Sequence, residues 1–459
     1  PSHLSSTRMI DRTRREFLRH GVLATAMAAG GAFSPAVSPS DSTGSQSPSL
    51  FPALRRDVSP FAPTSVRAAA ADEALPVAGV VTIYHRASHA DVLLGKILAG
   101  FQQDGGAGPP LKLAALYVDQ VGKNDLSREL SQRHGFPIVK TIDEALTLGG
   151  PELKVAGVLS IAEHGDYPYT PDTKQCQYPR RKFFDEIVAT FRRTGRTVPV
   201  FNDKHLSYRW ADALHMVETA KKMDFPLLAG SSLPVAWRHT TEQLPRDVEI
   251  EAALSVGYGG FEAYGFHALE NHQCQIERRR GGETGVVSAQ AARRDEIPRA
   301  AEAGRWSREL LDAALAVLPR KKELKPNWHD RDDVAIYLLN HRDGLRSSVV
   351  MANGVTDQFV FAAKIKGRAD PFVQWTRLQD GPPYGHFAYL LHAINHTVHA
   401  RRAAYPVERT LLTTGVLDRV MQSLAAGGKS LDTPELDVRY TAADWPFANH
   451  PGSRLTLPL

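Results

Sequence analysis

The sequence predicts an α/β domain with a parallel sheet, followed by an α+β domain with an open, mostly antiparallel sheet. In residues 75–230, short runs rich in β-branched residues alternate with stretches of helical spacing, which is typical of β-α-β units. In residues 231–384, runs of strand character are joined by tight turns such as His341–Gly344 (H-R-D-G), which favours antiparallel neighbours. Two closing helices are expected in residues 385–426 and a tail in 427–459.

Strands and helices are expected to alternate through the first domain. The predicted strands are Val77–Tyr84, Leu111–Asp119, Pro137–Val139, Ala156–Ile161, Val198–Phe201 and Pro226–Ala229. The predicted helices are Ala90–Gln102, Leu126–His134, Ile142–Leu146, Lys182–Thr194 and Tyr208–Met223. In an open parallel sheet, ligands bind at the carboxyl ends of the strands, so polar residues that follow these strands are the first candidates for a site.

The second domain is expected to begin with a strand on each side of a glycine-rich segment. These two strands are Ile250–Val256 and Gln273–Glu277, and the segment between them reads V-G-Y-G-G-F-E-A-Y-G-F-H-A-L-E. Three more strands and the two closing helices follow in order: Ala335–Asn340, Leu345–Asn353, Gln358–Lys366, Phe387–Ala400 and Val407–Leu424.

Composition is that of an ordinary globular protein. Of 459 residues, 42% are hydrophobic and 23% are charged, which suits two or three domains without a disulfide scaffold. Cys176 and Cys274 lie far apart, so they are expected either as two buried free thiols or as one disulfide. The net charge is +5, and residues 1–36 carry more than half of it. The rest is nearly neutral, which excludes a compositional case for nucleic-acid binding.

The start of the chain predicts export in folded form. From Thr13 the chain reads T-R-R-E-F-L-R, and the weakly apolar stretch Gly21–Ala32 follows. Adjacent arginines before such a stretch are typical of a twin-arginine signal, although a helix with a chance arginine pair is the alternative. We expect Met9 to be the true start, a signal in residues 1–36 and a disordered linker in 37–74. The location is then periplasmic or extracellular, the twin-arginine translocase is a partner during export, and no permanent membrane anchor is expected.

Several segments together resemble the glucose–fructose oxidoreductase and inositol dehydrogenase (Gfo/Idh/MocA) family. They are L-K-L-A-A-L-Y-V-D, A-G-V-L-S-I, T-V-P-V-F-N-D-K-H-L-S, G-G-F-E-A-Y-G-F-H-A-L-E and the last helix, P-V-E-R-T-L-L-T-T-G-V-L-D-R-V-M-Q-S. The resemblance implies a Rossmann-like first domain, NAD or NADP as cofactor, and hydride transfer on a sugar or sugar derivative. It also implies that a homo-oligomer could form through the open sheet.

The resemblance also implies catalytic residues. Lys204 matches the family's lysine at a strand end, with Asp203 where the family has glutamate and His205 where it has proline. His267 matches the catalytic histidine, and Glu270 matches the acid that follows it. In hydride transfer, His267 would act as base and Lys204 would polarise the oxygen. A surface lysine and a hydrogen-bonded core histidine remain the alternatives.

One departure from the family concerns the dinucleotide. The family opens with G-x-G-x-x-G after its first strand, where the backbone approaches the pyrophosphate at a helix N-terminus. This chain has Y-H-R-A-S-H-A-D-V there, and no glycine lies between Gly79 and Gly95. We therefore expect no ordinary pyrophosphate site at this turn. The remaining candidates are Asp119, His89, Glu163 and His164 for the cofactor, and Glu262, Tyr264, Glu270 and His205 for the substrate.

The abundance of histidines near strand ends leaves other functions open. With interleaved carboxylates they could bind a divalent metal, although no tight ligand spacing such as H-E-x-x-H occurs. A non-redox lyase, epimerase or hydrolase acting on carbohydrate, or a sugar-binding protein, would then share the same scaffold. The segment Tyr178–Lys182 (Y-P-R-R-K) is either a substrate contact or a solvated start of a helix.

Overall fold

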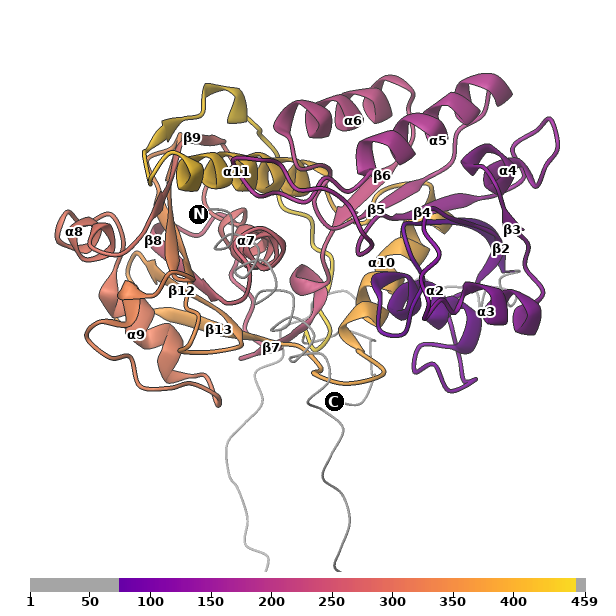
Figure 1. The fold of residues 1–459 in the computed structure, drawn as a ribbon. Helices are drawn as coiled ribbons and strands as arrows, with labels where there is room; N and C mark the ends of the chain where they lie inside the picture. The colour runs from indigo at the N-terminus through magenta and orange to yellow at the C-terminus, as the bar shows by residue number, and fades with distance from the viewer. Residues whose placement is uncertain (1–73, 451–459) are drawn as a thin grey trace, which may run out of the picture. The chain divides into compact units, whose positions relative to one another are not determined.

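The computed structural model describes residues 74–450 (Figure 1). The signal expected in residues 1–36, all but the last residue of the linker expected in 37–74, and residues 451–459 of the tail lie outside the described residues. Within 74–450, no helix combines the length and the apolar character that a membrane span requires.

A six-stranded parallel sheet forms the first half of the described chain. Its strands are β1 (Leu75–Val81), β2 (Leu111–Val118), β3 (Ile138–Val139), β4 (Gly157–Ile161), β5 (Val200–Asp203) and β6 (Leu227–Gly230). The order across the sheet is β3-β2-β1-β4-β5-β6, and every neighbouring pair is parallel. This is the Rossmann order, in which the direction of winding reverses between β1 and β4. The predicted α/β domain is confirmed.

Burial on both faces explains why the strands of this sheet are nearly continuous apolar runs. In β1, Ala78 and Val80 pack into one core cluster, while Val77 and Val81 pack into another. The helices between the strands are α2 (His89–Ala99), α3 (Ser127–His134), α4 (Ile142–Thr147), α5 (Arg180–Thr194) and α6 (Trp210–Lys222).

The second sheet has eight strands and is mostly antiparallel. Its order is β14-β9-β10-β11-β8-β12-β13-β7, and only β8 and β11 pair in parallel. The strands are β7 (Trp237–His239), β8 (Ile250–Gly257), β9 (Val286–Ala292), β10 (Ala335–His341), β11 (Arg346–Met351), β12 (Phe359–Ile365), β13 (Phe372–Arg377) and β14 (Leu431–Asp432). The predicted architecture of this domain is also confirmed.

The strand predicted at Gln273–Glu277 is wrong, because most of this segment is the end of helix α7 (Ala263–Ile276). The helix buries Glu270, Asn271, His272 and Gln273, so it lacks the apolar stripe by which a helix is recognised. The prediction also missed β7, β9, β13, α8 (Glu296–Glu302) and α9 (Arg308–Ala316).

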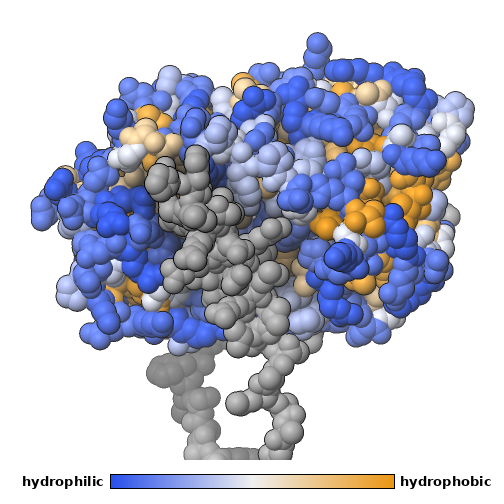
Figure 2. Space-filling view, in the orientation of Figure 1, coloured by the Kyte–Doolittle hydropathy of each residue, from blue (hydrophilic) through white to orange (hydrophobic). Residues whose placement is uncertain are grey.

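Helices cover both faces of the second sheet. Ser255 of β8 hydrogen-bonds His272 of α7, with 3.1 Å between Oγ and Nδ1. The alternate residues Leu254 and Val256 belong to the core cluster of α9, so α9 lies on the opposite face (Figure 1). The visible surface is mostly hydrophilic, with apolar residues gathered on the side of the six-stranded sheet (Figure 2). The self-association expected through the second sheet stays a prediction.

Two closing helices join the halves of the described chain. Helix α10 (His386–Ala400) packs near β4, where Val398 leaves no room for a side chain at Gly157. Helix α11 (Glu408–Ala425) lies against α6, α7 and β9, and Asp418 accepts a 2.9 Å hydrogen bond from the Trp210 amide at the start of α6. These contacts fix α7 of the second half relative to the carboxyl edge of the first sheet.

Candidate functional site

The candidate site lies where β4 and β5 end. These two strands are neighbours in the sheet, and the chain leaves them through Glu163 and Lys204. The switch in strand order between β1 and β4 is directly beside them, which is where open α/β sheets bind ligands.

Glu163 is a buried carboxylate that two cations share. Its side chain is 5% exposed, and its oxygens accept hydrogen bonds from Arg180 Nη2 at 2.5 Å and from Lys204 Nζ at 3.0 Å. Burial alone would raise the pKa of Glu163, but the charges of Lys204 and Arg180 hold that pKa well below its usual range. The carboxylate is therefore ionised, and it fixes both cations.

Arg180 corrects one expectation. A solvated start of the helix was the alternative for Tyr178–Lys182, yet Arg180 is 1% exposed, while Lys182 is exposed. The guanidinium lies 4.9 Å from the ring centre of Tyr178 and hydrogen-bonds His205 Nε2 at 3.2 Å. A charge at the start of a helix is usually solvated, so the sequence carried no signal for this burial.

Lys204 is held in an unusual backbone conformation. Its φ is +60°, in the left-handed region that costs free energy for residues other than glycine. Its amide donates to the carbonyl of Gly230, at the end of β6, at 3.1 Å. Gly230 itself has φ +120° and touches Glu270, so a side chain there would collide with the Glu270 carboxylate. This turn directs Lys204 toward Glu163.

Asp203 and His89 form a second pair in the same place. His89, the first residue of α2, has Nδ1 at 2.7 Å from Asp203 Oδ2, and the aspartate side chain is 1% exposed. A buried carboxylate that accepts from Nδ1 leaves Nε2 as the basic nitrogen of the imidazole. The sequence assigned these residues to separate roles, and the structure joins them.

His267 and His164 complete a cluster of polar side chains that also contains Glu163, Arg180, Lys204, Asp203 and His89. Burial lowers the pKa of His267 well below its usual value, and the positive charge of Lys204 lowers it further, so the imidazole is neutral. Burial also lowers the pKa of His164 to about 3. The charges of His89, Lys204 and Glu163 act on both histidines, which brings residues of β4, β5, α2 and α7 into one electrostatic neighbourhood.

Glu262 lies beside this cluster, and its carboxyl group has a raised pKa. One oxygen accepts a 2.8 Å hydrogen bond from the Cys176 amide. Burial raises the pKa of Glu262 to about 7, against the smaller lowering effects of that amide and of Arg180. The carboxyl group can therefore give or take a proton near neutral pH, which suits general acid–base work.

Some of the buried polar atoms that have no hydrogen-bond partner among residues 74–450 lie here. Four belong to the cluster: Asp203 Oδ1, His164 Nε2, Glu262 Oε1 and His267 Nδ1. Buried polar groups are nearly always paired, because an unmade hydrogen bond costs about 1–3 kcal/mol. Four such atoms in one place indicate a site where a polar ligand can supply the missing partners.

Three other candidate residues have protein partners instead. Both carboxylate oxygens of Asp119 accept tyrosine hydroxyls, Tyr117 at 2.9 Å and Tyr167 at 2.7 Å. Glu270 accepts a 2.8 Å hydrogen bond from Thr413 between α7 and α11. His205 is buried behind Arg180, where its Nδ1 contacts the Ser207 carbonyl at 2.8 Å. The hydrogen-bonding atoms of these three groups are therefore engaged within the protein.

Tyr264 borders the cluster. Its ring centre lies 5.9 Å from that of His267 and 5.1 Å from that of Tyr258. Both Tyr264 and His267 are partly exposed. Tyr264 therefore remains a candidate for contact with a ligand beside His267.

The turn between β1 and α2 is held by hydrogen bonds within itself. Asp91 accepts a 2.8 Å hydrogen bond from the Ala87 amide, and Ser88 Oγ caps the helix by accepting from the Asp91 amide. The amides of Ala87 and Asp91 are therefore engaged within the turn, and the Asp91 carboxylate lies in the first turn of α2, where it would repel an anion. The rings of His85 and His89 flank His164 at 5.6 and 5.5 Å, across the β1–β4 switch point. The expectation that no ordinary pyrophosphate site lies at this turn stays a prediction.

The histidines and acids do not form a metal centre in the described part of the chain. No group of three or more His, Cys, Asp or Glu side chains there is positioned to hold a metal ion. The two cysteines, Cys176 and Cys274, are free thiols.

Comparison with known proteins adds likenesses of structure only. No protein-family model matches the chain, and neither does any curated protein. One similar solved structure is that of GenD2 from gentamicin A biosynthesis in complex with NAD (14% identity, TM-score 0.48, covering 79% of this chain and 97% of that one). Another is apo scyllo-inositol dehydrogenase from Lactobacillus casei (12% identity, TM-score 0.46, covering 78% of this chain and 98% of that one). Biliverdin reductase from Synechocystis sp. PCC 6803, in complex with biliverdin and NADP+, is also similar (14%, 0.44, 76% and 98%). The fold of this chain is established by its strand order, independently of these likenesses.

The pKa of Glu262 gives a prediction for stability. In the folded protein this pKa is about 7, above the ordinary 4.5. The folded state therefore binds the proton more tightly than the unfolded state. The stability that this proton contributes is fully present below a pH of about 4.5 and is lost as the pH rises through 7. Glu262→Gln keeps the acceptor for Cys176 without the charge. As the pH rises from 5 to 8, we expect the free energy of unfolding of Glu262→Gln to increase relative to that of wild type by on the order of 1–2 kcal/mol, measured by urea unfolding. The exposed Glu323→Gln serves as control, and equal pH profiles for Glu262→Gln and wild type would contradict the assignment.

Proposed function

We propose that this protein is an oxidoreductase that acts on a hydroxyl group of a sugar or sugar derivative. The observation that carries the proposal is the gathering of four unpartnered buried polar atoms around Lys204, at the carboxyl edge of the Rossmann-ordered sheet. A polyhydroxylated molecule offers both donors and acceptors to such a surface. The family resemblance of the sequence supports the same reaction class.

Separate residues polarise the substrate hydroxyl, remove its proton and position it. Lys204 Nζ uses one donor on Glu163 and has further donors for a substrate oxygen. His89, oriented by Asp203, has a basic Nε2 that can take the hydroxyl proton, and the carboxylate stabilises the imidazolium that forms. Neutral His267 can orient the same hydroxyl through a hydrogen bond. In this proposal His89 acts as the base, and His267 positions the substrate.

Hydride transfer also needs an acceptor. The resemblance implies NAD or NADP, whereas the closed turn before α2, with its engaged amides and the Asp91 carboxylate, argues against a pyrophosphate bound there. We therefore assign only the proton chemistry to named residues. The T-R-R-E-F-L-R segment supports action after export, outside the cytoplasm.

The same closed turn favours a second candidate function. Proton removal and return on a sugar, as in an epimerase or a lyase, uses the base and the polarising lysine without an external dinucleotide. Glu262, with a pKa of about 7, would then supply the second acid–base group. Dinucleotide binding separates this candidate from the first.

We expect NAD+ or NADP+ to bind without contact between its pyrophosphate and the start of α2. Asp91→Asn should then change dinucleotide affinity by less than about twofold in calorimetric titration. Removing a like charge about 4 Å from a phosphate would instead strengthen binding by roughly tenfold or more, and that result would place the pyrophosphate on α2. If neither dinucleotide binds the wild-type protein, the oxidoreductase proposal fails and the non-redox candidate stands.

Alanine variants test the assigned residues. We expect Lys204→Ala and His89→Ala each to lower turnover on the order of a hundredfold or more, because each removes a group that touches the reacting hydroxyl. His267→Ala should raise KM more than it lowers kcat. The exposed residues His134 and Lys140 provide matched controls, and unfolding curves check the fold. Full activity of both Lys204→Ala and His89→Ala would reject the catalytic assignment.

A further inference from the structure

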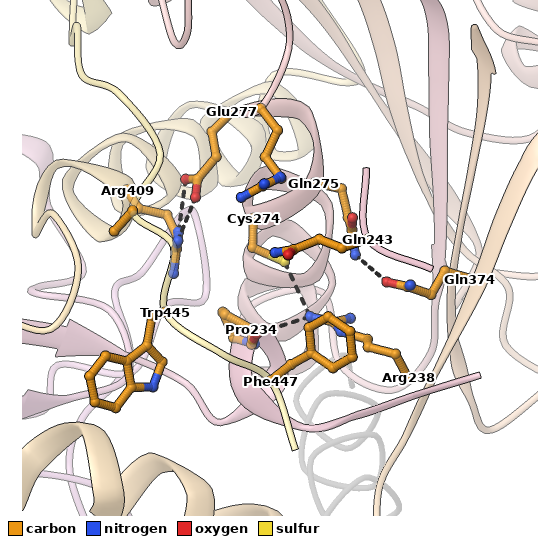
Figure 3. A pocket seen from close by; sticks show the side chains of 12 residues that line it. Pro234, Arg238, Gln243, Cys274, Gln275, Glu277, Gln374, Arg409, Trp445 and Phe447 are labelled. Atoms are coloured by element: carbon orange, nitrogen blue, oxygen red, sulfur yellow. Dashed lines mark hydrogen bonds and ion pairs between the residues drawn. The ribbon is translucent and has the colours of Figure 1, made fainter. Parts of the chain in front are cut away.

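A second polar site lies away from the candidate active site, around Arg238 of β7 (Figure 3). The Arg238 side chain is 2% exposed. Its Nη1 donates to Asn271 Oδ1 at 3.0 Å and to Thr376 Oγ1, and its Nη2 donates to the Leu233 carbonyl at 3.0 Å. All of these acceptors are neutral, and Nε has no partner among the described residues.

Among the described residues, no acid near Arg238 neutralises its positive charge. Glu277 is the buried acid nearby, but Arg409 binds both of its oxygens, at 2.8 and 2.5 Å. Arg278 pairs with Asp444, whose side chain is 63% exposed. Arg238 forms no ion pair with any acid in residues 74–450, so one buried positive charge is left over. An uncompensated buried charge costs several kcal/mol.

Cys274 does not supply the missing negative charge. Its sulfur lies 3.4 Å from Arg238 Nη2, but its own S–H donates to the Asn271 carbonyl at 3.3 Å. Burial raises the pKa of this thiol, even though the charges of Arg238 and Arg409 act against that rise. The group is therefore a neutral thiol that accepts a weak hydrogen bond from the arginine.

A small cavity adjoins Arg238, and Figure 3 shows the side chains that line it. Its volume of about 30 Å³ is roughly twice what one water molecule needs by the same measure. That space suits a halide or formate-sized anion. Gln243, Gln275 and Gln374 add amide groups to the wall, and the Gln243 amide has no partner among the described residues.

We propose that this cavity binds a small monovalent anion, chloride in the first instance, which balances the charge of Arg238 and ties β7 to α7. The Gln243 amide would provide a neutral donor to the same anion. None of the residues of the candidate active site lines this cavity, so the proposal is independent of the proposed function.

Bromide tests the proposal directly, because it replaces chloride and scatters anomalously. The full chain, crystallised in sodium bromide, should show an anomalous peak in the cavity beside Arg238. In solution, the melting temperature should rise with the logarithm of bromide concentration at constant ionic strength, with gluconate as the bulky replacement anion. Arg238→Met should abolish the rise, and the exposed Gln132→Ala is the control.

Gln243→Ala tests the same proposal even if Arg238→Met does not fold. It should weaken bromide binding by roughly three- to tenfold, because one hydrogen bond to the anion is lost. The absence of both the anomalous peak and the bromide-dependent rise would overturn the proposal. Rapid alkylation of Cys274 at pH 7 in bromide-free buffer would also overturn it, because a thiolate would then balance Arg238.

Discussion

Glu163 is the one acid that Arg180 and Lys204 share, and the candidate site depends on this buried arrangement. The carboxylate can hold both cations only because β4 and β5 are neighbours and α5 begins with Arg180 at the same edge. Loss of the acid would leave two buried cations unpaired, which costs several kcal/mol for each. The left-handed turn at Lys204 is sustained by the same ion pair and by the hydrogen bond to Gly230.

The network continues outward through aromatic side chains. Arg180 lies against Tyr178, the Tyr178 ring contacts Tyr167 at 5.6 Å between centres, and the Tyr167 hydroxyl donates to Asp119. Asp119, at the end of β2, thereby supports the loop that carries Glu163 rather than standing free. The edge of the sheet is a preorganised polar wall, with the hydrogen-bonded pair of Asp203 and His89 next to it. Preorganised groups of this kind stabilise charge that develops during a reaction.

The sequence predicted the position of Lys204 but not its partners. An apolar strand followed by a lysine in a β-α-β pattern already locates that lysine at the carboxyl edge. The pairing of His89 with Asp203 joins residues 114 positions apart, and no local pattern encodes such a contact. The sequence left Arg180 as either a substrate contact or a solvated residue at a helix start. Only the fold shows that it is buried and paired with Glu163, in the loop after β4. Helix α7 was missed because its buried face is largely polar.

Strand order and ligand contacts in the first domain depend on different residues. Strand order depends on apolar burial in β1 to β6, whereas pyrophosphate binding depends on a few glycines and free amides. In this chain Asp91 and Ser88 accept hydrogen bonds from the Ala87 and Asp91 amides, and the rings of three histidines lie near one another at the switch point. The site at the ends of β4 and β5 retains polar groups that lack protein partners.

A crystal structure of the protein soaked with a panel of monosaccharides and cyclitols tests the central claim most directly. The account predicts that a bound molecule places one hydroxyl oxygen within about 3.2 Å of both Lys204 Nζ and His89 Nε2. Its other hydroxyls should supply partners for Glu262 and His267. Sugars bound elsewhere on the molecule, with the edge around Lys204 left empty, would contradict the account.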